Sequence, residues 1–255
     1  MKNIRIPFLS KILARFDDIH KIRFSNPEED YLFFLPYGGC FLLIIFMPIN
    51  DIWKLIDFDN DFSKKFQDRL MHKYKSNIQR ILYYHGCEKT YLSKNPYFTS
   101  FYYTLKYNFP DAKFVGCHRN PEESIPSLLS NMQEAYLIMS RDIYRDNHIE
   151  KYIMMYYKYI SVLQQGLDIS NNFILFNISQ IKRDLKNTVK EIYGSFNYTI
   201  SLDYKSILEE ESIYSKNYMS KHKYDINEYS YINNKLITEK LNKVLLNYKT
   251  IEIKK

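Results

Sequence analysis

The sequence predicts an α/β fold in which helices flank a parallel β-sheet. Short apolar runs alternate with long segments of helical periodicity, and such runs are typical of buried parallel strands. The length of 255 residues suits one domain of this kind. No internal repeat, low-complexity linker or change of composition divides the chain. We therefore expect a single domain over residues 1–255.

Each expected helix is a segment in which apolar residues recur three and four positions apart. These helices cover Phe62 to Tyr84, Phe98 to Tyr107, Pro121 to Met132, Asn147 to Gln165, Ile181 to Tyr193, Tyr204 to Tyr214 and Asn234 to Asn247. Each expected strand is a short apolar run between polar residues. These strands are Thr90 to Leu92, Lys113 to Cys117 and Asn172 to Phe176. Gly86 is the expected end of the first helix.

The charge of the chain favours an anionic partner. Lys and Arg number 36 against 29 Asp and Glu, a net charge of +7. We find no basic run or helix with clustered Lys and Arg beyond Lys254-Lys255, so a phosphorylated small molecule is expected rather than a nucleic acid. The cysteines Cys40, Cys87 and Cys117 lack metal-ligand spacing, which predicts reduced, buried thiols in a cytoplasmic protein without a bound metal.

One uncharged stretch, Tyr31 to Pro48, approaches the length of a membrane span. Pro36 and Gly38-Gly39 interrupt it, and acidic residues crowd its start. We expect two buried segments joined by a turn, and no stable membrane span. The residues that follow Met1 show no sustained apolar segment of the secretory kind.

Ligands of parallel α/β sheets bind at the carboxyl ends of the strands. Arg119 leaves the strand Lys113 to Cys117 where the chain enters a helix, and Ser127 lies eight residues further along. A guanidinium and a hydroxyl near a helix start can hold a phosphate monoester, which arginine binds in a bidentate way. The alternative is that Arg119 pairs with a nearby acid and that Ser127 faces solvent.

Lys94, in Lys94-Asn95-Pro96, follows the first expected strand. Its side chain is therefore expected at the same edge of the sheet as Arg119. A lysine there could neutralise the charge that develops on a leaving phosphate. The alternative is a solvated lysine in a loop.

The segment TYLSKNPYFTSFYYTLKYNFPDAKFVGCHRNPEESIPSLLSNM resembles the central part of the bacterial-type sulfotransferase family. In that family a strand ends in Lys-Ser/Asn-Pro, and a helix and a Phe-Pro-Asp-Ala-Lys-Phe strand follow. An Arg-Asn/Asp-Pro turn comes next, with a serine eight residues after its arginine. Flanking segments fit in the same order, and the resemblance extends from about Phe8 to Tyr248.

The resemblance implies a P-loop nucleotide-binding fold and 3′-phosphoadenylyl sulfate as co-substrate. Arg119 and Ser127 match the positions that hold its 3′-phosphate, and Lys94 matches the lysine beside the sulfate and the bridging oxygen. Lys221, His222 and Lys223 match a basic loop that closes over the donor. A hydroxyl or amine of a small-molecule, glycan or lipid acceptor would attack sulfur in line as adenosine 3′,5′-bisphosphate leaves.

The sequence departs from the family in its phosphate loop. Neither GxxxxGK[ST] nor a Ser-Gly-Thr-type loop occurs in the chain. We therefore expect the fold without its first strand–loop–helix unit, a truncated chain that alone performs no appreciable transfer, and a possible complementing N-terminal fragment.

The general base is the second departure. Where the family often has a histidine and an arginine, this chain has Phe98-Thr99-Ser100-Phe101. Glu29 is the candidate base, although acids at this place also suit the first turn of a helix. His85 and His118 are the other candidates.

Two other functions stay open at this point. One is a non-catalytic binder of adenosine 3′,5′-bisphosphate or of a protein partner on the same scaffold. The other is a P-loop kinase, against which the missing Walker lysine counts.

Overall fold

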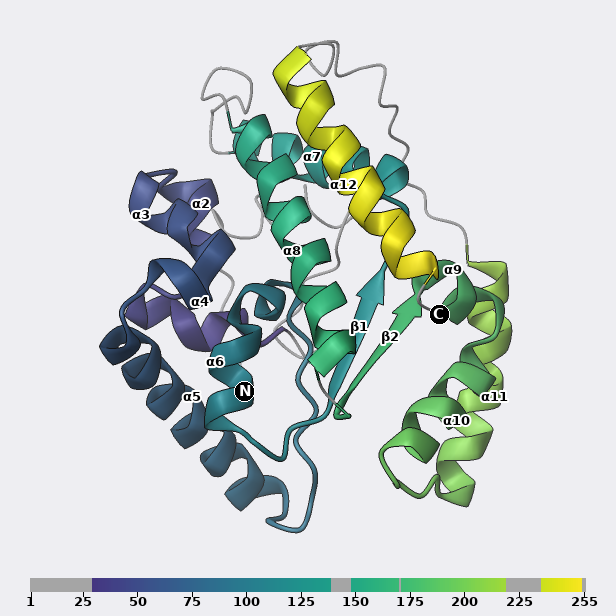
Figure 1. Ribbon diagram of the computed structural model, residues 1–255. Helices are drawn as coiled ribbons and strands as arrows, with labels where there is room; N and C mark the ends of the chain where they lie inside the picture. The colour runs from purple at the N-terminus through teal and green to yellow at the C-terminus, as the bar shows by residue number, and fades with distance from the viewer. Residues whose placement is uncertain (1–28, 139–147, 170, 219–234, 254–255) are drawn as a thin grey trace. The chain divides into compact units, whose positions relative to one another are not determined.

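The structure is a computed structural model that describes residues 29–138, 148–169, 171–218 and 235–253 (Figure 1). The chain forms two compact units. The first comprises Met1–Pro110 and Ser127–Lys158, and the second comprises Asp111–Pro126 and Tyr159–Lys255. Helices α7 (Pro121–Ile138) and α8 (Ile149–Ile169) contribute to both. The expectation of a single domain stays a prediction.

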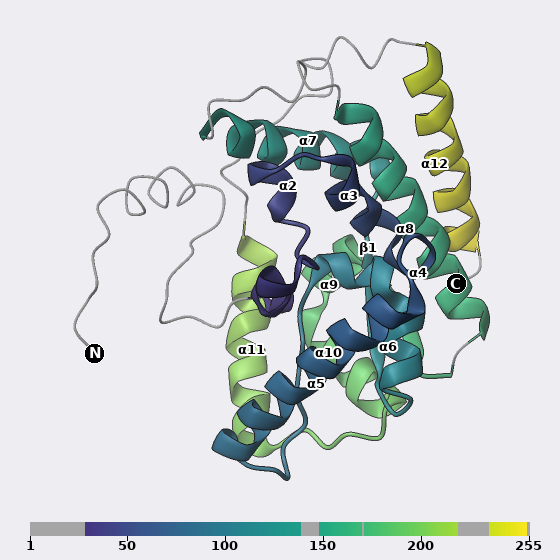
Figure 2. The same ribbon diagram turned by 90° about the vertical axis from the view of Figure 1, so that its left-hand side faces the viewer.

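The first unit is helical in its described part. Its other elements are η1 (Asp30–Tyr37), α2 (Leu43–Phe46), α3 (Asn50–Trp53), η2 (Lys54–Asp57), α4 (Phe58–Asp61), α5 (Lys64–His85), η3 (Pro96–Phe101) and α6 (Tyr102–Asn108). Figure 2 shows α5 and α6 side by side. Phe58 of α4 stacks on Phe101 of η3 with ring centroids 3.8 Å apart. Aromatic side chains therefore form much of this unit's core.

The long helix α5 confirms the expected helix Phe62 to Tyr84. The helix begins after Ser63, whose hydroxyl oxygen accepts a hydrogen bond from the N–H of Phe66. Its end is Gly86, which has a φ of 125° and donates its N–H to the Leu82 carbonyl. A left-handed φ of this kind favours glycine, which explains why the helix stops there.

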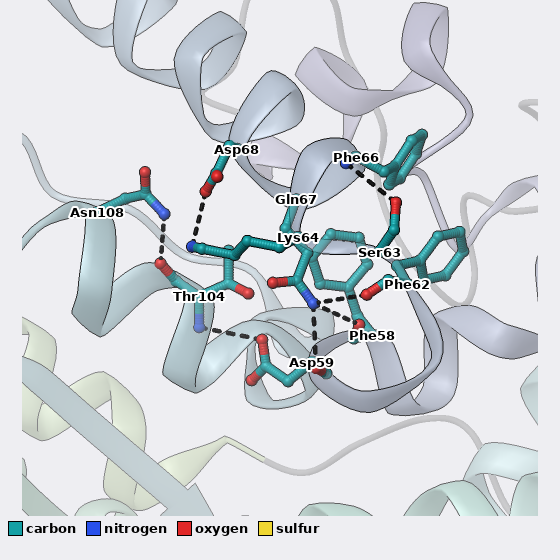
Figure 3. A network of polar contacts seen from close by, with 10 residues as sticks. All are labelled: Phe58, Asp59, Phe62, Ser63, Lys64, Phe66, Gln67, Asp68, Thr104 and Asn108. Atoms are coloured by element: carbon teal, nitrogen blue, oxygen red, sulfur yellow. Dashed lines mark hydrogen bonds and ion pairs between the residues drawn. The ribbon is translucent and has the colours of Figure 1, made fainter.

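A polar network fixes α5 against α4 and α6 (Figure 3). The buried Gln67 amide donates to the carbonyls of Phe58, Asp59 and Phe62 at 3.3, 3.0 and 3.1 Å. The Asp59 carboxylate accepts the backbone N–H groups of Tyr103 and Thr104 at 2.8 and 3.0 Å. Gln67 thus binds carbonyls of the α4 turn, and Asp59 of α4 binds N–H groups at the start of α6, which as helix-end groups need partners.

The stretch Tyr31 to Pro48 contains η1 and α2, separated by a turn. Gly38 has a φ of 73° and Gly39 is buried against Leu70 of α5. This confirms two segments joined by a turn, but each segment is only partly buried, since Leu32, Leu35 and Phe46 are exposed. Among the described residues, no helix is both long and apolar enough to cross a membrane.

The outward face of α5 corrects one expectation. Lys65, Arg69, Lys73 and Arg80 are exposed and recur at spacings that place them on one side of the helix. The sequence analysis expected no helix with clustered cations, because other residues separate these four cations along the sequence.

The second unit is built on two parallel strands, β1 (Phe114–His118) and β2 (Phe173–Asn177), which lie side by side in Figure 1. In their register Phe114 pairs with Phe173 and His118 with Asn177. Its other helices are α9 (Ile178–Arg183), α10 (Leu185–Ser195), α11 (Leu202–Asn217) and α12 (Lys235–Ile253). The fold is therefore a helix-rich α/β fold with a parallel two-stranded sheet in the described part.

Two expected strands are confirmed, each one residue further along than predicted. The expected strand Thr90 to Leu92 is wrong, since residues 90–95 form an extended segment without a strand partner among the described residues. The expected helix Ile181 to Tyr193 is divided at Asp184. That residue has a φ of −145°, and its carboxylate accepts the N–H of Asn187, so it ends α9 and caps α10.

Two glycines let α8 approach the strand pair closely. A Cβ at Gly116 of β1 would lie 2.8 Å from Leu175 and 2.9 Å from Phe173, and a Cβ at Gly166 of α8 would lie 2.8 Å from the Phe173 ring. Both positions are buried. The ring of Phe173 therefore occupies the space that side chains at these positions would need.

We expect Gly166→Ala to destabilise the protein. Overpacking against a ring costs about 1–3 kcal/mol, which exceeds the gain of about 1 kcal/mol in helix propensity. Gly194→Ala in α10 is the matched control, because nothing lies within 4 Å of a Cβ there. It should stabilise the chain by about 0.5–1 kcal/mol. Urea unfolding of both variants measures the difference, and equal effects would contradict this packing.

Candidate functional site

The first unit brings Lys94 and Glu29 together. The Lys94 ammonium forms an ion pair with Glu29 Oε1. The lysine side chain is 74% exposed and the glutamate side chain 15% exposed. The two candidates for sulfuryl-transfer chemistry therefore form one charged pair whose lysine end reaches solvent.

The segment that carries Lys94 alternates between inward and outward side chains. Tyr91, Ser93 and Asn95 are half-buried, whereas Leu92 and Lys94 are exposed. The Asn95 side chain accepts the N–H of Tyr97 at 3.0 Å and so caps η3. Because successive side chains of an extended segment point to opposite sides, Lys94 projects outward when its neighbours are held inward.

Asp30 is the group that holds those neighbours. Its buried carboxylate accepts hydrogen bonds from the Tyr91 hydroxyl at 2.9 Å and the Ser93 hydroxyl at 2.5 Å. A third bond comes from the hydroxyl of Tyr74 on α5 at 2.5 Å. Charge-assisted hydrogen bonds of this kind are the strong ones in proteins. Asp30, the residue next to Glu29, therefore joins α5 to the Lys94 segment.

The hydroxyls of Tyr74 and Tyr91 are hydrogen-bond donors to Asp30 that do not readily lose their protons. Burial, together with the hydrogen bond to Asp30, raises the pKa of the Tyr74 hydroxyl far above its ordinary value. Burial and then the nearby charge of Asp30 raise the pKa of the Tyr91 hydroxyl in the same direction. Both phenols therefore stay protonated over the whole physiological range.

In the second unit, Arg119 follows the carboxyl end of β1. Its Nε donates to Glu123 Oε2 at 2.8 Å, one helical turn further on, and the arginine side chain is 34% exposed. Asn120 caps α7, because its side chain accepts the Glu122 N–H at 3.0 Å. Arg119 therefore adopts the alternative that the sequence analysis considered, a pair with a nearby acid.

His118, Asn177 and Tyr248 gather at the same strand ends. His118 is 3% exposed, and its ring meets that of Tyr248 edge to face with centroids 5.3 Å apart. Asn177 donates from its amide to the Tyr248 hydroxyl at 3.1 Å. Helix α12 is thereby joined to both strands. The burial of His118 gives it a packing role and removes it from solvent.

The remaining predicted site residues have different outcomes. Ser127 lies half-buried within α7, and its convergence with Arg119 stays a prediction. Lys221, His222 and Lys223 lie outside the described residues. His85 is exposed in the last turn of α5. No group of three or more potential metal-ligating side chains occurs within the described ranges. The expected burial of the cysteines is confirmed for Cys40 and wrong for Cys87 and Cys117, which are exposed.

Several polar residues of the site were missed by sequence reasoning. Asp30 and Glu123 were both assigned to the first turn of a helix, and the hydrogen bonds that Asp30 accepts were not predicted. Asn177 could have been found, because it directly follows the apolar run Asn172 to Phe176 and so belongs to a strand end. Tyr248 carries no signal of its own, since it is one of 25 tyrosines.

Comparison with known families identifies the class of protein. The sequence profile described as the Sulfotransferase family matches residues 54–201, more than half of the chain. This chain therefore belongs to the sulfotransferase family, and by family it is a transferase of sulfuryl groups. The matched range contains Lys94, Arg119 and Ser127, whereas Glu29 precedes it and Lys221 follows it. Searches of curated proteins and of solved structures found no match.

Proposed function

We propose that this chain acts as a sulfotransferase that uses 3′-phosphoadenylyl sulfate and transfers its sulfuryl group to a hydroxyl or amine of a small-molecule, glycan or lipid acceptor. The family match carries the proposal, because it spans Lys94, Arg119 and Ser127 in the order that the resemblance requires. In the same proposal β1 and β2 are two strands of a P-loop nucleotide-binding sheet.

On the donor side, Arg119 and Ser127 hold the 3′-phosphate, and Lys221 and Lys223 close over the nucleotide. The chemistry of Arg119 fits this role. Its guanidinium follows a strand end, is partly exposed, and already binds an oxyanion in the form of the Glu123 carboxylate. A phosphate dianion offers the same geometry with more charge, so it would compete with Glu123 for the guanidinium.

Lys94 and Glu29 have different roles in the transfer step. The acceptor oxygen or nitrogen forms a bond to sulfur while the bond from sulfur to the bridging oxygen breaks, and adenosine 3′,5′-bisphosphate leaves. Glu29 takes the proton of the acceptor, and the Lys94 ammonium stabilises the charge that develops on the bridging oxygen. Their ion pair places the two side chains next to each other.

The cradle of the 5′-phosphosulfate is the part that this sequence does not supply. No Ser-Gly-Thr-type loop occurs in the 255 residues. A complementing segment is therefore part of the proposal, and the expectation that the chain alone performs no appreciable transfer stays a prediction.

The donor site is tested by calorimetric titration of the purified chain. We expect adenosine 3′,5′-bisphosphate to bind at least about tenfold more tightly than adenosine 5′-monophosphate, because a charge-assisted phosphate contact contributes about 1.5–3 kcal/mol. ATP, which lacks the 3′-phosphate, should not displace the bisphosphate. Equal affinities for the two adenosine nucleotides, or displacement by ATP, would count against the proposed function.

A further inference from the structure

We propose that Asp30 is a positioning residue that holds Glu29 and Lys94 against each other. The inference rests on the proposed function, in which this pair carries the chemistry of transfer. Asp30 itself does not touch the reacting atoms in this proposal. It acts through its neighbours in the chain.

The argument begins with a cross-link between two segments that are distant in sequence. Glu29 and Asp30 are adjacent, and so are Ser93 and Lys94. The Ser93 hydroxyl donates to Asp30 Oδ2, and the Lys94 ammonium pairs with Glu29 Oε1. Two consecutive residues of one segment thus contact two consecutive residues of the other. The buried contact fixes the backbone from which the more exposed pair projects.

Burial decides which of the two contacts sets the geometry. Asp30 is 7% exposed, whereas the Lys94 side chain is 74% exposed. An exposed ion pair contributes little on its own, because solvent screens it and two long side chains must be ordered. A buried carboxylate with hydroxyl donors is held far more strongly. The Asp30 network therefore fixes the Lys94 segment. The position of the Glu29–Lys94 ion pair is a consequence of this order.

The network is also anchored to a rigid element. Tyr74 lies on the buried face of α5 and donates to the same oxygen, Oδ2, as Ser93. Tyr91 donates to Oδ1, so both carboxylate oxygens are used. The Tyr74 hydroxyl also interacts with the Ser93 side chain, so the three groups form one cluster. Tyr74 joins Asp30 to the core, whereas Ser93 and Tyr91 join it to the Lys94 segment.

The test is a nuclear magnetic resonance measurement of Lys94 in the full chain without donor. Lysines are labelled as carbon-13 dimethylamines, which keep their positive charge, and the Lys94 signal is assigned by its loss in Lys94→Arg. Glu29→Gln defines the signal of the broken pair. We expect Ser93→Ala and Asp30→Asn to move the Lys94 signal most of the way to that position.

Gln67→Leu is the matched control, because it removes buried hydrogen bonds of α5 to the α4 turn that involve neither Asp30 nor the Lys94 segment. It should lower the melting temperature and leave the Lys94 signal in place. Ser93→Thr keeps a hydroxyl and should restore the wild-type signal. An unmoved signal in Ser93→Ala would overturn the proposal, even if Asp30→Asn failed to fold. The measurement needs no sulfuryl donor. If the Lys94 signal moves as expected but adenosine 3′,5′-bisphosphate does not bind, the proposed function is contradicted and the role of Asp30 is not.

Discussion

Replacing Arg119 by alanine is expected to weaken the binding of adenosine 3′,5′-bisphosphate by about tenfold to a hundredfold, since a bidentate contact between arginine and phosphate contributes about 1.5–3 kcal/mol. The loss should vanish for adenosine 5′-monophosphate, which has no 3′-phosphate for the guanidinium to hold. Calorimetric titration of both nucleotides measures it. Lys186→Ala is the matched control, because it removes a cation of the same unit that pairs with Glu209 on α11.

Substitution of Glu123, the partner of Arg119, is expected to have the opposite effect on bisphosphate affinity. Glu123 competes with the phosphate for the guanidinium, so Glu123→Gln should strengthen bisphosphate binding by up to about fivefold, the range of an exposed ion pair of 0–1 kcal/mol. A merely structural Arg119–Glu123 pair would behave differently. In that case both substitutions would lower affinity together, through damage to the start of α7.

The second large effect is expected at Asp30. Asp30→Ala should reduce the free energy of unfolding by about 2–4 kcal/mol, because it leaves the hydroxyls of Tyr74, Tyr91 and Ser93 without their acceptor. Tyr74→Phe removes one of these bonds and should cost about 1 kcal/mol. Urea unfolding at neutral pH measures both.

The exposed Glu210 of α11 provides the control for this comparison. Glu210→Ala should change stability by no more than about 0.5 kcal/mol, as surface substitutions usually do. Should Asp30→Ala cost no more than Tyr74→Phe, the carboxylate would not be the centre of the network.

The strand pair and most helices could be predicted because their signals are local. The apolar runs Lys113 to Cys117 and Asn172 to Phe176 give β1 and β2, and Gly86 and Pro121 mark helix boundaries. The expected strand at Thr90 to Leu92 failed for an instructive reason. The expectation rested on a short apolar run, but Leu92 is exposed, and Tyr91 is held by its hydrogen bond to Asp30 and not by a neighbouring strand.

The site could be predicted only in part. Lys94 and Glu29 were chosen separately, one from a resemblance and one from an acidic cluster, and nothing in the sequence indicated that they would pair. Their contact joins segments more than sixty residues apart, as does that of Ser93 with Asp30. The pairing of Arg119 with Glu123, by contrast, follows from helical spacing, and the sequence analysis had it as an alternative.

The most direct test of the account is a crystal structure of the chain with adenosine 3′,5′-bisphosphate. The account predicts that the 3′-phosphate lies within hydrogen-bond distance of both the Arg119 guanidinium and the Ser127 hydroxyl, with Glu123 displaced from the arginine. A bound nucleotide whose 3′-phosphate lies elsewhere, with Arg119 still paired to Glu123, would contradict it.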